Sequence, residues 1–136
     1  MIDYSRIPSP CYVIEEERLR KNLSLIKHVA DASGAEIILA FKGFAMWSVF
    51  PVVREYVSGA AASSIHEARL CFEEMGTPAH TYAPAFRRDE FGTILRYSSH
   101  ITFNSLEQYR KFAPALHREG KHISCLLYTS PSPRDS

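Results

Sequence analysis

Short apolar runs alternate along this chain with longer segments in which apolar residues recur at helical spacing. The apolar runs begin near Glu36, Gly59, Ala79, His100 and His122, which are 23, 20, 21 and 22 residues apart. Each interval has room for one strand followed by one helix. The pattern therefore predicts four consecutive β/α units followed by a fifth strand.

The first helices can be placed from their apolar spacing and their end signals. Residues 15–33 carry one apolar stripe, and Gly34 follows as a stop because glycine readily adopts the left-handed conformation of a helix end. Residues 47–57 form a second predicted helix, with Pro51 in its first turn, where a missing N–H costs little. The stripe of the first helix consists of Leu19, Leu23, Ile26 and Ala30.

Two later helices are marked at both ends. Each begins with a capping box, in which a serine hydroxyl and an acidic or amide side chain three residues later satisfy free N–H groups at the helix start. Each closes at a glycine. In the first of these helices the capping box is Ser64 with Glu67 and the closing glycine is Gly76. In the second they are Ser105 with Gln108 and Gly120.

The alternation restricts the fold class to α/β. Strands that are separated by helices and share one sheet are parallel, and their right-handed crossovers leave two architectures. These are an open doubly wound sheet and a (β/α)8 TIM barrel. The spacing alone does not choose between them.

The end of the chain departs from this pattern. A Ser/Pro-rich polar stretch, TSPSPRDS, follows the start of the fifth strand and is unsuited to a buried strand. From about Leu126 the sequence resembles a translated cloning or sequencing-adapter scar; a natural disordered tail is the alternative. We therefore expect a partial barrel domain over residues 1–125 and a non-native tail over residues 126–136.

Composition narrows the class of protein further. The 136 residues are 46% hydrophobic, enough for one domain with a core, and carry a formal net charge of +1. Such a balance favours neither nucleic acid nor an anionic membrane as a partner. Three cysteines without a C-x-x-C pair fit a reducing compartment, and no apolar run approaches the roughly 20 residues that span a bilayer. A cytoplasmic protein is expected.

Lys42 is the residue with the clearest chemical potential. It ends the apolar run of the first strand, and functional groups of parallel α/β folds gather at the carboxyl ends of strands. An amine among apolar neighbours loses hydration, which lowers its pKa and exposes a nucleophile that can condense with a carbonyl. The alternative is an ordinary strand-terminal lysine whose head reaches water.

Three blocks of sequence carry a family resemblance. Ser9 to Ile14 resembles the entry segment of the alanine-racemase-like, fold-type III pyridoxal-phosphate enzymes, which include ornithine and diaminopimelate decarboxylases. In those enzymes the first barrel strand ends in the cofactor lysine, and Lys42 matches that place. The blocks KGFAMWSVFP, SSIHEARL and TFNSL resemble the carboxynorspermidine/carboxyspermidine decarboxylase family, over about residues 7–124.

The resemblance implies the N-terminal part of a (β/α)8 barrel, truncated, that holds pyridoxal 5'-phosphate on Lys42. It also implies decarboxylation of a carboxylated polyamine to norspermidine or spermidine, with Lys42 as the catalytic residue, and a homodimer as the full-length form. Phosphate- and pyridine-binding groups would follow Ser124, so residues 1–136 alone are expected to be inactive. Related decarboxylases carry an acidic residue in the second strand, whereas this chain has alanines at 60–62.

Other candidate residues have simpler interpretations. Glu67 completes a helix cap and His66 beside it is read as solvated. The histidines lack metal-ligand spacing, so no metal is expected. Aromatic residues near Lys42 either shape a pocket or belong to the core. These three are Phe44, Trp47 and Phe50.

Three rival functions stay open at this point. The first is another fold-type III enzyme, such as diaminopimelate decarboxylase. The second is a barrel in which Lys42 stores the cofactor without turnover. The third is a cofactor-free open α/β binding domain, which would favour carboxylates at strand ends where this chain has Ala62, Ala83 and Asn104.

Overall fold

A five-stranded parallel sheet organises residues 2–128, the part of the chain that the computed structural model describes. The strands lie in chain order, with each pairing only with its sequence neighbours. Their bounds are β1 (Leu39–Ala40), β2 (Ala60–Ala62), β3 (Ala79–Tyr82), β4 (Ser98–Phe103) and β5 (Ser124–Leu127). The prediction of successive parallel strands separated by helices is confirmed, since β1 to β5 form four β/α units and a fifth strand.

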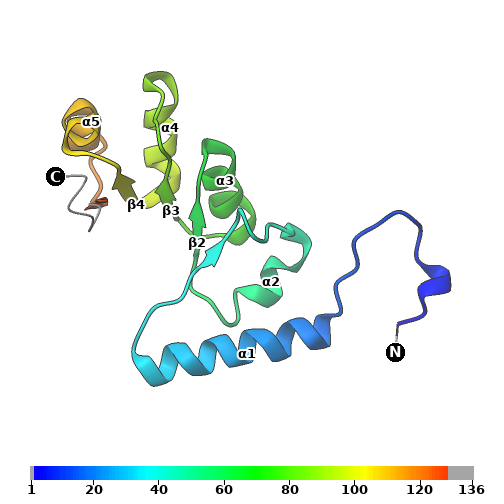
Figure 1. Cartoon of the computed structure of the whole chain (residues 1–136). Helices are drawn as coiled ribbons and strands as arrows, with labels where there is room; N and C mark the ends of the chain where they lie inside the picture. The colour runs from blue at the N-terminus through cyan, green and yellow to red at the C-terminus, as the bar shows by residue number, and fades with distance from the viewer. Residues whose placement is uncertain (1, 129–136) are drawn as a thin grey trace, which may run out of the picture.

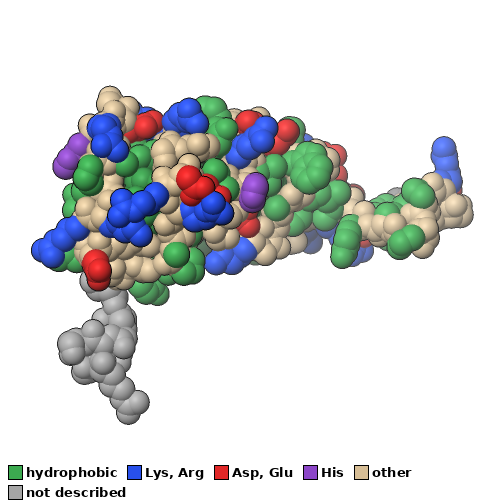
Figure 2. Space-filling model, turned by 90° about the horizontal axis from the view of Figure 1, so that it is seen from above, with side chains coloured by type: hydrophobic (Ala, Val, Ile, Leu, Met, Phe, Trp, Pro, Cys, Tyr) green, Lys and Arg blue, Asp and Glu red, His purple; other side chains and the backbone are tan. Residues whose placement is uncertain are grey.

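Helices alternate with these strands, and Figure 1 shows α3, α4 and α5 side by side along the sheet. The residues before α1 extend from the body as a narrow arm (Figures 1 and 2). The helices are α1 (Glu16–Ser33), α2 (Phe50–Val53), α3 (Ile65–Leu70), α4 (Arg88–Tyr97) and α5 (Leu106–Arg118). Short 3-10 helices cover Tyr4–Arg6 and Trp47–Val49, and a π turn over Cys71–Met75 extends α3.

The predicted helix ends are largely confirmed. Gly34, Gly76 and Gly120 all take the left-handed conformation, with φ of 71°, 72° and 74°. A residue with a Cβ would be strained at these positions, which explains why the helices stop there. Ser64 and Ser105 cap α3 and α5 through their hydroxyls.

Three predicted elements are shorter or less buried than expected. Of the first apolar run, only Leu39–Ala40 forms the strand β1, in register with Ala60 and Ala61 of β2. The predicted helix over residues 47–57 breaks into the 3-10 helix and the four residues of α2, with Pro51 in the first turn of α2. The α1 stripe forms, but Leu23 is its one buried member and Ile26 is 37% exposed.

Helices pack on one face of the sheet, and the other face is open. Buried residues of β2 and β3, such as Ala60 and Thr81, alternate with the half-buried Ala61 and His80. The buried set packs against the helices in two apolar clusters, one around α2 and α3 and one around α4 and α5. Because alternate side chains of a strand point to opposite faces, the other face is the open one. In a barrel that open face is the interior.

The predicted boundary at residue 125 falls inside an element. Strand β5 runs across it, with Leu126 and Leu127 in register with Thr102 and Phe103 of β4. Residues 129–136, which hold the Ser/Pro-rich stretch, lie outside the described residues. A non-native origin of residues 126–136 stays a prediction.

Candidate functional site

Lys42 lies where the sequence placed it, directly after β1 at the carboxyl edge of the sheet. The N–H of Phe41 continues the ladder to the carbonyl of Ala61 at 3.2 Å. The N–H groups of Gly43 and Phe44 then fold back onto the carbonyl of Ala40, at 3.0 and 3.1 Å. Lys42 is therefore the middle residue of a tight turn that closes the strand.

The apolar surroundings expected for Lys42 are not present within residues 2–128, where its side chain is exposed. Phe41, its apolar neighbour in sequence, packs into the core on the helix side and is buried away from solvent. Phe50 is fully buried, Phe44 packs partly on the same cluster, and Trp47 is 61% exposed. Desolvation by these residues therefore does not explain a reactive amine.

The loop after β2 is held by its own polar groups. The Ser64 hydroxyl accepts from the N–H of Glu67 at 3.1 Å. The Glu67 carboxylate in turn accepts from both the N–H and the hydroxyl of Ser63, at 2.7 and 2.8 Å. The cap interpretation of Glu67 is thus confirmed, although the carboxylate reaches one residue further back than the standard box. His66 is exposed, as expected.

A pair of histidines on the open face is the feature that sequence reasoning missed. His80 of β3 and His100 of β4 are register partners, and their rings stack with centroids 3.8 Å apart. Burial, followed by the proximity of His100, lowers the pKa of His80 below its ordinary value of 6.5. The signal in the sequence is a histidine near the start of each of two adjacent strands, although the spacing of the histidines bears only on metal binding.

Metal binding has no support in the part of the chain that is described: residues 2–128 contain no group of three or more His, Cys, Asp or Glu suited to a metal ion. No helix within those residues has the length and apolar character needed to cross a membrane.

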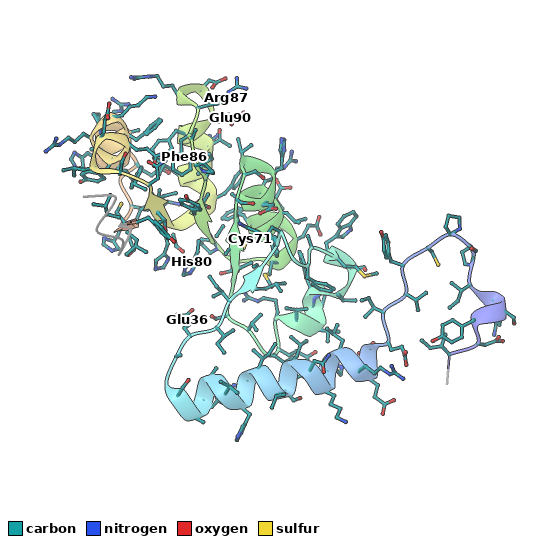
Figure 3. All side chains as sticks on the ribbon, viewed as in Figure 1. Glu36, Cys71, His80, Phe86, Arg87 and Glu90 are labelled. Atoms are coloured by element: carbon teal, nitrogen blue, oxygen red, sulfur yellow. The ribbon has the colours of Figure 1, made fainter. Side chains whose placement is uncertain are left out.

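A small cavity of about 220 Å³ lies between α3 and α4 at the carboxyl edge of the sheet. Phe86, Arg87 and Glu90 line it on the α4 side, at the opposite end of the sheet from Glu36 (Figure 3). The guanidinium of Arg87 is already bonded to Asp89 at 2.6 and 3.1 Å. The Ser63 and Ser64 hydroxyls at its other wall serve the α3 cap, so these hydroxyls and Arg87 are already engaged within the protein.

Comparisons with known curated proteins point to one enzyme group. The chain is 40% identical to the carboxynorspermidine/carboxyspermidine decarboxylase of Campylobacter jejuni over 132 residues, which are 97% of this chain and 35% of that protein. It is 46% identical to the carboxyaminopropylagmatine decarboxylase of Synechocystis over 112 residues, 82% of this chain and 29% of that protein. The chain thus spans about a third of the length of these curated relatives.

Solved structures agree on the fold. The crystal structure of carboxynorspermidine decarboxylase from Campylobacter jejuni, complexed with norspermidine, matches with a TM-score of 0.81 at 42% identity and covers 88% of this chain and 31% of that one. D-threonine aldolase from Filomicrobium marinum matches with a TM-score of 0.78 at 12% identity, over 96% of this chain and 37% of that one. This second likeness concerns the fold alone.

A match to a family model that covers most of the chain identifies the family. The model of the family "Alanine racemase, N-terminal domain" matches residues 14–129. Four parallel β/α units and a fifth strand, all in chain order, match the N-terminal part of such a (β/α)8 barrel. The chain therefore belongs to the alanine racemase N-terminal domain family.

Proposed function

We propose that this chain is the lysine-bearing part of a pyridoxal-phosphate-dependent decarboxylase of carboxylated polyamines. The substrate would be carboxynorspermidine or carboxyspermidine, and the product norspermidine or spermidine. The observation that carries this proposal is the position of Lys42, an exposed amine at the carboxyl end of β1 in a barrel of this family. The 40% identity to a named decarboxylase of these substrates supports the choice of reaction.

The residues present fit a covalently held aldehyde cofactor. Within residues 2–128 the Lys42 ammonium takes part in no ion pair or hydrogen bond, so its nitrogen is available to a ligand. A primary amine is the group that condenses with a carbonyl. The turn formed by Gly43 and Phe44 fixes the backbone from which the side chain reaches out. Lys42 would hold the cofactor through Nζ.

The chemistry is divided between the cofactor and this lysine. When bound, pyridoxal phosphate stabilises the electrons that a departing carboxylate leaves on the substrate's α-carbon. The carboxylate leaves as carbon dioxide, and a proton takes its place on that carbon. Lys42 Nζ, when not bonded to the cofactor, is a group that can carry this proton. Groups for the phosphate and the pyridine nitrogen are expected on later strands and on a partner subunit.

The decisive test replaces the lysine in the full-length protein. We expect Lys42→Arg and Lys42→Ala to abolish both the borohydride-reducible cofactor and the release of carbon dioxide from carboxynorspermidine. Lys27→Arg is the matched control, because Lys27 is an exposed residue of α1 that pairs with Asp31 at 3.3 Å. Turnover and a covalent cofactor that survive Lys42→Arg would contradict the proposal.

A second candidate substrate has its own support. The chain is 46% identical to a carboxyaminopropylagmatine decarboxylase over 82% of its length. That substrate ends in a guanidinium, whereas carboxynorspermidine ends in a primary amine. Comparing kcat/KM for the two compounds on the full-length protein separates the candidates.

The assembly and location of the full-length protein complete the proposal. We expect a cytoplasmic homodimer in which the partner subunit closes the site. Light scattering of the purified protein measures the first property, and cell fractionation measures the second. Residues 1–136 expressed alone are expected to release no carbon dioxide, because one lysine does not make a complete site.

A further inference from the structure

The residue that precedes Lys42 is anchored by a flat aromatic stack. Phe41 is 3% exposed and Phe50 is fully buried at 0%. Their ring centroids are 5.1 Å apart, and their planes differ by only 5°. Phe50 is the first residue of α2, so the stack connects the end of β1 to the helix that packs beneath it.

This stack fixes the residue from which the turn to Lys42 begins. Phe41 is buried among the helices, whereas Lys42, the next residue and the middle of the turn, is exposed. Hydrogen bonds from the N–H groups of Phe41 and Gly43 hold the backbone around Lys42. The Phe41 ring is the side-chain anchor next to the lysine, and its orientation depends on the face of Phe50.

A lysine needs such an anchor more than a rigid residue would. Its side chain has four rotatable bonds and is exposed, so within residues 2–128 the backbone of Lys42 is the part that is held in place. A reacting nitrogen must be placed to a fraction of an ångström, since a 1 Å error costs on the order of 100-fold in rate. A leucine in place of Phe50 would fill most of the volume but would not offer a flat face to fix the Phe41 ring.

We propose that Phe50 is a positioning residue, which acts through the stacked ring of Phe41 to present Lys42 to the cofactor. This inference rests on the proposed function. It differs from a purely structural role because it predicts an effect on the lysine–cofactor bond that an equal loss of packing elsewhere does not produce.

The test compares two substitutions in the full-length protein, each of which removes one buried aromatic ring. Phe50→Leu removes the stack beneath Lys42. Phe91→Leu is the matched control, because Phe91 is 1% exposed and packs on Phe112 with centroids 4.3 Å apart, in the other apolar cluster. Four quantities are measured for each variant: the thermal midpoint, the pH titration of the cofactor's visible absorbance, the fraction of cofactor that borohydride fixes on Lys42, and kcat and KM separately.

We expect both variants to lose similar thermal stability. Only Phe50→Leu should shift the pH titration of the absorbance, lower the fraction fixed on Lys42, and reduce kcat about tenfold or more with a smaller change in KM. Phe41→Leu, which removes the other ring, should reproduce these effects. Equal spectra and equal kinetics for Phe50→Leu and Phe91→Leu would overturn the inference.

Other outcomes are equally informative. If Phe50→Leu and Phe41→Leu both fail to fold while Phe91→Leu folds, the stack is a folding element and the inference is wrong. If the unmodified protein shows no cofactor fixed on Lys42, the proposed function fails first. If that cofactor is present and unchanged in Phe50→Leu, only the positioning role fails.

Discussion

His80 and His100 lie face to face on the open side of the sheet, with ring planes 11° apart and centroids separated by 3.8 Å. Two imidazolium ions in this arrangement would repel each other, so the pair favours a neutral ring at His80. The Ser99 hydroxyl lies 2.9 Å from Nδ1 of His100. Glu36, below His80 in Figure 3, acts in the opposite direction and favours the charged form, but more weakly than burial and His100 together.

The stack predicts acid sensitivity of the folded state. The pKa of His80 is lowered on folding, so its contribution to stability is complete above the unfolded value near 6.5 and is lost as the pH falls through the lower folded value. We expect His80→Phe, which keeps a flat ring but cannot be protonated, to be less destabilised between pH 7.5 and pH 5 than the parent protein. Urea-unfolding midpoints at the two pH values measure this. Parallel losses in both proteins would contradict it.

A buried hydroxyl pair predicts an asymmetric mutational effect. The Thr81 and Ser98 hydroxyl oxygens are 2.8 Å apart, and the Ser98 hydroxyl donates to the Ile94 carbonyl at 2.7 Å. Both residues are essentially unexposed, at 1% and 0%. Ser98→Ala therefore leaves the Thr81 hydroxyl unsatisfied and should cost about 1–3 kcal/mol.

The double variant provides the control for this pair. Adding Thr81→Val to Ser98→Ala removes the unsatisfied Thr81 hydroxyl while keeping the shape of the side chain at position 81. We expect the double variant to be more stable than Ser98→Ala alone, as measured by the free energy of unfolding in urea. A double variant that is less stable than the single one would show that the cost comes from packing instead.

The cap of α3 predicts a third effect. Ser64→Ala removes the acceptor for the Glu67 N–H and should lower the free energy of unfolding by about 1 kcal/mol. Ser24→Ala is the matched control, since that hydroxyl donates to the Arg20 carbonyl within α1 and caps nothing. The control should change stability by less than about 0.5 kcal/mol. Equal effects of the two substitutions would rule out the capping account.

Local signals in the sequence predicted much of this fold. The glycines at 34, 76 and 120 stop helices because only glycine takes their left-handed backbone at little cost. Ser64 and Ser105 begin helices because their hydroxyls satisfy N–H groups a few residues away. Burial was harder to predict, because it depends on segments that lie far away in the sequence. The stripe of α1 is regular, yet Ile26 stays 37% exposed because burial requires a partner surface.

The same division applies to the candidate site. Lys42 could be placed from the sequence because it ends an apolar strand. The exposure of Lys42 could not be predicted, because it depends on Phe41 packing into the core against Phe50. The stacking of His80 on His100 could not be predicted from the sequence either. Ala79 pairs with Ser98, but a register shift at the next residue brings His80 opposite His100 instead of Ser99.

By itself the sequence determined the order of strands and helices, the helix ends and the strand-terminal lysine, because each depends on interactions between residues close together in the chain. Tertiary structure alone decided which face of the sheet stays open, which rings stack and which hydroxyls meet. Those relationships depend on strand register and helix packing, and a single shift in register changes the partner of every side chain beyond it.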